Sequence, residues 1–421
     1  MQSQNSYKSI VLIFLLLASC FPVRDISTIN MASRYRNVDQ KFHPEFELYN
    51  INDTTLRLFI KFSPGELLFV RQNNDRFSAS LQVNCELINS YESTKLIDSS
   101  SATFSFDLAE RESIRVLSAD MPVSSIGEFL LHIFLTDRNK EYTEDFYENF
   151  DNIAKPSRND FLVTGTDGQP VFRNYLFPED TVRIYYRDIS IENLYCKYYH
   201  RDFALAYPPF SFDIRDEFNY KPDSVFTINP GTENDVVLPA EGFYHFQTDS
   251  SLKSGLTLFR FYSGFPDITS PKTMIEAVRY LTSKKEYEEM LESTNPKSVI
   301  DNFWLTHGGN EEKSRLLIKK YYGRVREANR YFSSYTEGWR TDRGMIYVIF
   351  GSPGTIYKSS QSESWIYGTP NSTLALNFFF IKVTNPFTDN DFQLSRSPTY
   401  ESNWYRAVEI WRQGRAYNSF Y

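Results

Sequence analysis

Few residues of this 421-residue chain are placed for catalysis or metal binding. It has five histidines, and no two of them stand at the spacing of paired metal ligands: His43, His132, His200, His245 and His307. No His-Glu-x-x-His or Cys-x-x-Cys pattern occurs, nor does the Gly-x-Ser-x-Gly elbow that presents a nucleophilic serine. We therefore predict no metal site, no cofactor and no catalytic residues.

Two other patterns bear on catalysis. Gly351-Ser352-Pro353-Gly354 follows an apolar run, as a phosphate-binding loop would, but Pro353 removes a backbone donor that such a loop uses, so we predict a turn. Carboxylate pairs such as Glu288-Glu289 are expected by chance, and no glycosidase pair can be singled out. An enzyme acting on peptidoglycan or polysaccharide remains an alternative function.

A basic stripe lies on the helix predicted from Asn310 to Phe332. Helical spacing places four cations on one face: Arg315, Lys319, Arg326 and Arg330. A charged stripe of this kind is usually a solvated face. The alternative is a surface that binds carboxylates or phosphates.

The densest group of polar and aromatic residues is Gly338-Trp339-Arg340-Thr341-Asp342-Arg343. In a structural interpretation, Gly338 permits a backbone conformation that a β-carbon would oppose, and Thr341 and Asp342 bond nearby N–H groups to hold a tight turn. Trp339 would cap the core and seek one acceptor for its indole N–H. Gly344 would then release the chain into a central strand over 345–350, making a helix-to-strand joint.

A functional interpretation of the same residues is also open. Arg340, Asp342 and Arg343 would line a cleft, with Trp339 as a stacking platform for a sugar or a peptide. The sequence does not choose between a binding site and a structural joint.

Gly338, Trp339, Thr341 and Asp342 resemble the motif of the GWxTD domain family, known mainly from cell-envelope proteins of Bacteroidota and related bacteria. The flanks match as well: Phe303-Trp304, Tyr321-Tyr322, Arg324-Val325, Ala328-Asn329, Phe332, Arg343-Gly344, Ile346-Tyr347, Gly351, Pro353 and Trp365-x-Tyr367. Thr306-His307, Ser352 and Gly354 depart from the family pattern, so the resemblance implies no binding role for those positions. The resemblance covers residues 267–412 and implies no activity.

The elements that position this motif follow a helical period after Asp267. Pro271 suits the first turn of a helix, and further helices are predicted over 296–304, 310–332 and 404–411. Apolar runs at 374–383 and 392–394 predict two paired strands.

Between residues 40 and 265 the dominant period is two, as in Leu56-x-Leu58-x-Ile60-x-Phe62, and turn residues separate the runs. A glycine near an aromatic residue opens a strand at Gly127 and again at Gly242, which suggests two similar units. We predict a mainly β protein: two tandem antiparallel β-sandwich (Ig-like) domains, 40–155 and 156–266, followed by an α+β GWxTD domain, 267–421.

The N-terminus has the features of a lipoprotein signal peptide, residues 1–19. An apolar run, residues 10–18, is too short to span a membrane and ends in Leu17-Ala18-Ser19-Cys20. The last four residues resemble a bacterial lipobox, which implies that Cys20 is acylated. Residues 20–39 are predicted to be a lipidated tether, and the absence of an aspartate next to Cys20 favours the outer membrane, with the protein facing the periplasm or the cell surface.

Charge and cysteine usage limit the partners. The formal net charge of -8 argues against nucleic acid. Cys85 and Cys196 are expected to be free buried thiols, with a bridge between them as the alternative. We predict a non-catalytic envelope lipoprotein whose C-terminal domain docks a protein or glycan partner, with an accessory subunit of a secretion or outer-membrane assembly complex as a further alternative.

Overall fold

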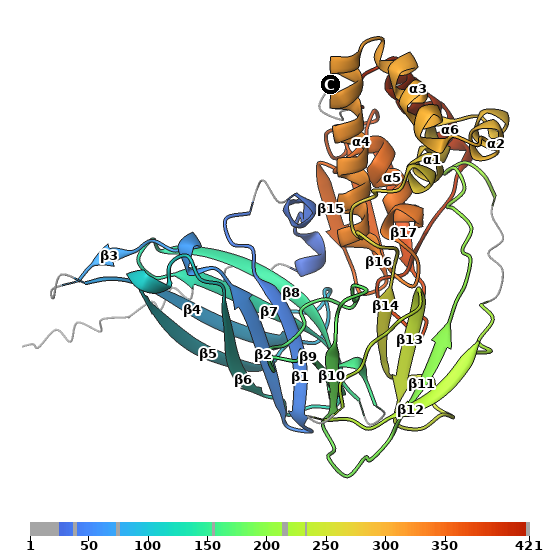
Figure 1. Cartoon of the computed structure of the whole chain (residues 1–421). Coiled ribbons are helices and arrows are strands. Elements are labelled where there is room, and N and C mark those ends of the chain that lie inside the picture. The colour runs from blue at the N-terminus through green and yellow to red at the C-terminus, as the bar shows by residue number, and fades with distance from the viewer. Residues whose placement is uncertain are drawn as a thin grey trace, which may run out of the picture.

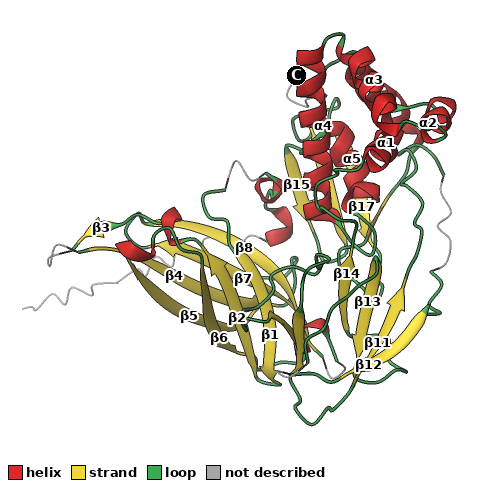
Figure 2. Cartoon of the chain, viewed as in Figure 1, coloured by secondary structure: helices red, strands yellow, loops and turns green. Residues whose placement is uncertain are grey.

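The computed structural model describes residues 25–36, 40–72, 76–153, 156–212, 218–231 and 234–417. It is a mixed α/β protein of 34% strand and 26% helix, with antiparallel sheets first and helices towards the C-terminus (Figures 1 and 2). The prediction of a mainly β protein is therefore wrong in its proportions, because helices account for a quarter of the residues. The predicted signal peptide and Cys20 lie outside the described residues.

Two antiparallel sheets form what we call the first β unit. One has the order β1-β2-β6 and the other β3-β4-β7-β8, with β5 paired to β4. Alternate residues of β2 and β4 are buried, as the period of two predicts, and residues from both sheets make one apolar core. The strands are β1 (Glu45–Asn52), β2 (Thr55–Phe62), β3 (Val70–Arg71), β4 (Phe77–Ile88), β5 (Leu96–Asp107), β6 (Arg115–Pro122), β7 (Gly127–Asp137) and β8 (Tyr142–Asn152).

The second β unit pairs β9 (Phe161–Gly165) with β10 (Val182–Tyr186) and has a four-stranded sheet of order β12-β11-β13-β14. That sheet comprises β11 (Leu194–Tyr199), β12 (Ser224–Ile228), β13 (Gly242–Gln247) and β14 (Leu256–Arg260). Gly242 opens β13 with a φ of +133°, and a β-carbon there would lie 2.3 Å from the Tyr199 carbonyl oxygen. The expectation that this glycine opens a strand is confirmed, and so is the one for Gly127 in β7.

The C-terminal unit packs helices against one face of an antiparallel sheet of order β15-β16-β17-β18 (Figure 1). Pro271 and Pro296 stand in the first turns of α1 and α3, and Asn310 caps α4 through its side chain. The helices are α1 (Pro271–Ala277), α2 (Lys284–Leu291), α3 (Pro296–Gly308), α4 (Glu311–Phe332), α5 (Asp342–Phe350) and α6 (Glu401–Arg412). The strands are β15 (Thr355–Lys358), β16 (Ser362–Tyr367), β17 (Leu376–Lys382) and β18 (Phe392–Leu394).

The predicted strand over 345–350 is wrong, because these residues are the greater part of helix α5. Every residue of α5 is buried, so the helix shows no polar face. A short run that is apolar on all sides carries no periodicity, and its sequence cannot distinguish a buried helix from a buried strand. The other elements predicted for the C-terminal unit, including the pairing of β17 with β18, are confirmed.

The predicted tether is wrong for residues 25–36, which pack between the first β unit and the C-terminal unit (Figure 1). This segment forms η1 (Ile26–Thr28) and η2 (Ala32–Tyr35). Met31 N donates to the Ile356 carbonyl at the edge of β15, and Ser27 N donates to the Tyr91 carbonyl of the first β unit. Ile26 and Met31 are buried in the same core as the C-terminal helices. The local sequence is polar enough to suggest a tether, and only the tertiary structure supplies the surfaces that bury its few apolar residues.

Cys85 and Cys196 are both free and buried, as expected. Burial raises the pKa of the Cys85 thiol to about 12. Among the described residues, no helix combines the length and the apolar character needed to cross a bilayer.

Candidate functional site

The motif 338–343 lies where a short 3₁₀ helix, η7 (Gly338–Arg340), turns into α5. It therefore joins a helix to a helix, and the predicted helix-to-strand joint is corrected in that respect. Trp339 is 0% exposed, and Asp342 and Arg343 are each 1% exposed. The motif thus lies inside the C-terminal unit, between α4 and α5.

Gly338 is required by close packing, and its backbone has no unusual conformation. Its φ is not among the positive values of the described residues. A β-carbon on Gly338 would lie 1.9 Å from the Ala328 carbonyl oxygen in α4, and one on Gly344 would lie 1.8 Å from the Gly338 carbonyl oxygen. The prediction of a special conformation at Gly338 is wrong, and the need for glycine comes from backbone contact between neighbouring elements.

Trp339 fills the core beside Tyr280, whose hydroxyl donates to the Trp339 carbonyl at 3.0 Å. Its backbone N–H donates to Asn329 Oδ1 in α4. The indole N–H has no hydrogen-bond partner, so the acceptor expected for it is not found. Because the ring is wholly buried, a sugar or peptide could not stack on it in this structure.

Thr341 caps the N-terminus of α5. Its hydroxyl accepts from Gly344 N at 3.1 Å and donates to the Gly338 carbonyl at 2.7 Å, which confirms its predicted turn-holding role. The Asp342 carboxylate also reaches the sheet, a contact that the sequence did not predict. Its Oδ2 accepts from Leu394 N in β18 at 2.8 Å, and its Oδ1 pairs with Arg396 Nη2 at 2.6 Å. This carboxylate also stands at the positive end of the α5 dipole, where a negative charge is stabilising.

Arg343 forms a fully buried ion pair with Glu363 in β16, at 3.0 Å between Nη1 and Oε1. The Trp365 indole N–H donates to the other carboxylate oxygen at 3.0 Å, and Lys358 Nζ lies 3.6 Å from Oε1. Burial alone would raise the pKa of Glu363, but Arg343 and Lys358 together with these hydrogen bonds lower it below its usual value. The second Arg343 amino group donates to the Asn390 carbonyl at 2.9 Å.

Arg324 of α4 stabilises the other end of α5. Its Nη1 donates to the Val348 and Ile349 carbonyls at 3.1 and 3.0 Å, where the last turn of the helix lacks internal partners. A β-carbon at Gly351 would lie 2.7 Å from Arg324 Nη2, so the glycine makes room for the guanidinium. Burial lowers the pKa of Arg324 to about 10.

Three partners in this cluster were not identified from the sequence: Glu363, Asn390 and Arg396. Glu363 could have been identified from the sequence, because it alternates with Trp365 and Tyr367, which places a carboxylate on the buried face of a strand. Nothing in the sequence marks Asn390 or Arg396, because each contacts its partner only in the folded protein.

The Arg340 side chain is partly exposed, at 21%. It pairs with Glu276 at 2.7 Å and with Glu337 at 3.2 Å, and its guanidinium lies over the Trp339 ring. The residues proposed to line a cleft therefore point to different partners inside the protein. Among the described residues, no group of three histidine, cysteine or acidic side chains is arranged to hold a metal ion.

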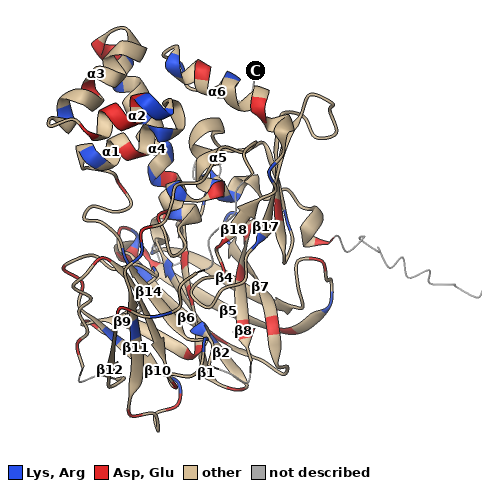
Figure 3. Ribbon diagram, turned by 90° about the vertical axis from the view of Figure 1, so that its right-hand side faces the viewer, with Lys and Arg blue, Asp and Glu red and all other residues tan. Residues whose placement is uncertain are grey.

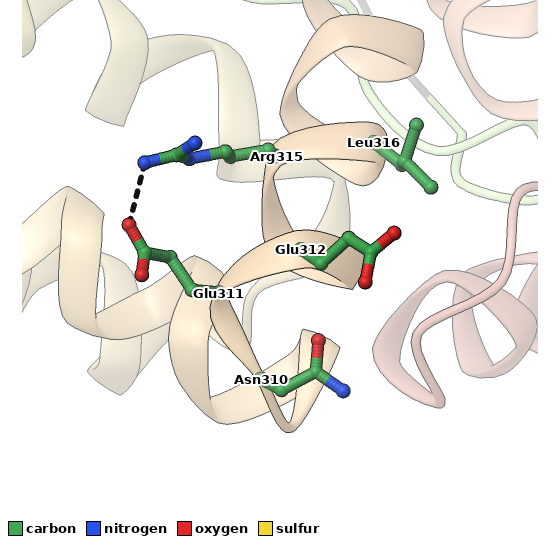
Figure 4. Close-up of a pocket in the computed structure, with 5 residues that line it drawn as sticks. All are labelled: Asn310, Glu311, Glu312, Arg315 and Leu316. Carbon is green, nitrogen blue, oxygen red and sulfur yellow. Dashed lines mark hydrogen bonds and ion pairs between the residues drawn. The ribbon is translucent and has the colours of Figure 1, made fainter.

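The basic stripe of α4 is exposed, and it alternates with acidic residues over the helical part of the molecule (Figure 3). Arg315 pairs with Glu311 within the helix and Arg326 pairs with Asp267. A surface hollow of about 590 Å³ lies at the start of this helix, lined by Asn310, Glu311, Glu312, Arg315 and Leu316. These side chains point in different directions and do not converge on one ligand position (Figure 4).

Two glycines of the C-terminal unit provide a matched test of the packing at the motif. We expect Gly338→Ala to destabilise the protein by several kcal/mol, because the new β-carbon meets backbone atoms of α4. Gly323→Ala, within α4, meets nothing within 4 Å and should stabilise by about 0.5–1 kcal/mol. Urea unfolding of both variants measures the difference, and a loss of less than 1 kcal/mol for Gly338→Ala would contradict it.

The buried ion pair gives a pH-dependent prediction. Glu363→Gln should cost about 3–5 kcal/mol at pH 7, because Arg343 loses its counter-charge. Since the folded-state pKa of Glu363 is lowered, its contribution is present above the ordinary glutamate pKa and is lost as the pH falls through the folded value. Urea unfolding at several pH values should show the gap between wild type and Glu363→Gln narrowing in acid. An exposed control, Glu289→Gln, should show no such gap, and a gap independent of pH would count against the assignment.

Comparison with known proteins supports the family resemblance that the motif indicates. No curated protein matches the chain. The family model described as the GWxTD domain matches residues 242–413, which include the motif and both of its buried ion pairs. The match begins at β13, before residue 267, where the resemblance in the sequence begins. The C-terminal part of this protein, residues 242–413, is therefore a GWxTD domain.

Proposed function

We propose that the protein is a non-catalytic lipoprotein of the bacterial cell envelope, anchored through Cys20. On this proposal its GWxTD domain docks a protein or glycan partner next to the membrane. The outer membrane is the proposed site, with the body facing the periplasm or the cell surface.

The observation that carries the proposal is the packing of the segment that follows Cys20. Met31 N donates to Ile356 O of β15, and Ile26, Met31 and Ala32 are buried in the core that includes the helices of the GWxTD domain. Four residues lie between Cys20 and the start of this segment at Asp25, and an extended chain over those five Cα–Cα steps reaches at most about 18 Å. An acylated Cys20 would thus hold the GWxTD domain close to the lipid surface as one body with its anchor.

A docking role is favoured over catalysis by how the motif is used. The ionised groups of Asp342 and Arg343 are paired inside the domain and are not available to a substrate. Any contact with a partner must then come from the surface. On β17, Phe379 and Ile381 are 40% and 50% exposed and are alternate residues of the strand, so they lie on one face of the sheet.

The two β units would act as spacers that support this domain. We propose that they are sandwiches of the immunoglobulin type. In the first unit, buried residues from both of its sheets contribute to one core.

The anchor is tested by Cys20→Ser in the native bacterium. We expect wild type in the membrane fraction after a carbonate wash, with acyl chains on its N-terminal peptide by mass spectrometry, and the variant in the supernatant. Cys196→Ala, which removes a buried thiol elsewhere, should remain in the membrane. A variant that stays membrane-bound, or a wild-type peptide without acyl chains, would refute the anchor.

The docking surface is tested by a photo-crosslinking residue at Phe379, with Ile189 as the control. Ile189 is 98% exposed in the second β unit, so both positions present an apolar side chain to solvent. We expect an adduct from intact cells at Phe379 that is absent at Ile189 and is removed by Ile381→Glu. Protease or glycosidase sensitivity then identifies the class of partner, and an integral membrane protein would favour the accessory-subunit alternative. The same products at both positions, or none at Phe379, would contradict docking through this face.

A further inference from the structure

The outward face of the five-stranded sheet in the first β unit carries a mainly polar surface with few charged side chains. Its hollow of about 640 Å³ lies over β5, β4, β7 and β8. The lining residues are Asn84, Cys85, Glu86, Ser99, Ser100, Ser101, Phe134, Thr136 and Thr143. None of them is a lysine or an arginine, and one is acidic.

The strand register arranges the outward side chains in rows across the sheet. One row is Thr103, Gln82, Thr136 and Thr143, from β5 to β8. The next is Ser101, Asn84, Phe134 and Asp145. Three strand spacings make each row about 14 Å wide, so the face suits an extended chain.

Hydroxyl and amide groups dominate these rows, and several already bond to one another. Ser101 Oγ donates to Asn84 Oδ1 at 2.7 Å, and the hydroxyls of Thr136 and Thr143 are 2.8 Å apart. These contacts hold the side chains in place while leaving further donor and acceptor positions. A partly exposed aromatic ring, Phe134, lies among them, with the His132 ring beside it at 3.9 Å.

This chemistry selects among ligands. Glu86 lies opposite His132, and Asp145 lies opposite Phe134 and pairs with Arg34 and His132. No lysine or arginine is among the residues that line the hollow, so the two carboxylates disfavour polyanions and phosphates. A neutral sugar chain supplies hydroxyls for the amide and hydroxyl groups and an apolar ring face for Phe134.

We propose that this face binds a neutral polysaccharide, as a second binding surface separate from the GWxTD domain. The surface ends where Arg34 of the N-terminal segment reaches over the Tyr147 ring in β8. A sugar chain bound there would lie beside the segment that leads to Cys20. The proposal stands independently of docking by the C-terminal unit, since none of its residues belongs to that unit.

Affinity electrophoresis of the purified full-length protein in mild detergent tests the site. The gels contain a soluble neutral polysaccharide (β-glucan, galactomannan or arabinoxylan) or an acidic one (alginate or polygalacturonate). We expect at least one neutral polysaccharide to retard wild type and neither acidic one to do so. Phe134→Ala and Asn84→Ala should each raise the dissociation constant obtained from the retardation about tenfold.

Phe226→Ala is the matched control, because it removes a phenylalanine that is 39% exposed from a different sheet, in β12 of the second β unit. It should bind polysaccharide like wild type, and Phe134→Ala should leave the photo-crosslinked adduct at Phe379 unchanged, so the two proposals can fail separately. Circular dichroism melting confirms that each variant is folded. Absence of retardation by every neutral polysaccharide, stronger binding of the acidic ones, or unchanged binding by folded Phe134→Ala and Asn84→Ala would overturn the site.

Discussion

The C-terminal domain depends on burying both ends of one short helix. Helix α5 has nine residues and no exposed face, so its terminal N–H and C=O groups cannot be satisfied by water. The protein supplies replacements at each end. Thr341 accepts from Gly344 N at the N-terminus, and Arg324 donates to the last carbonyls. Without these partners, each unpaired terminal group would lower the free energy of unfolding by about 1–3 kcal/mol. Several such losses together would exceed the net stability of a typical domain.

The residues of the motif make the contacts that hold α5 in the domain. Gly338 and Gly344 let η7 approach α4 and α5 at backbone distance, and Trp339 fills the space beside them. Asp342 connects the N-terminus of α5 to β18, and Arg343 connects it to β16 through Glu363. The motif therefore couples one helix to two strands of the sheet. Because Trp339, Asp342 and Arg343 are buried, they are not exposed for contact with another molecule.

The N-terminal segment extends this arrangement to the rest of the molecule. Tyr35 packs against Phe332 and Trp365, and its hydroxyl donates to Glu363 at 3.3 Å, so the segment reaches the same buried ion pair. Arg34 lies over Tyr147 of the first β unit. The segment that follows the proposed anchor thus contacts both the GWxTD domain and the first β unit.

The sequence by itself determined the elements whose pattern is local. Prolines at the starts of α1 and α3, the asparagine cap of α4 and the alternation in β2 and β7 follow from short-range sterics and periodicity. It also marked the motif as the central feature of the C-terminal part. The tertiary structure alone decided that residues 345–350 are helical, that residues 25–36 are packed, and that Asp342 and Arg343 have partners in β18, Glu363 and Arg396. The reason is physical: a segment buried on every side has no amphipathic period, and the partners of a buried charge are set by contacts between residues far apart in the chain.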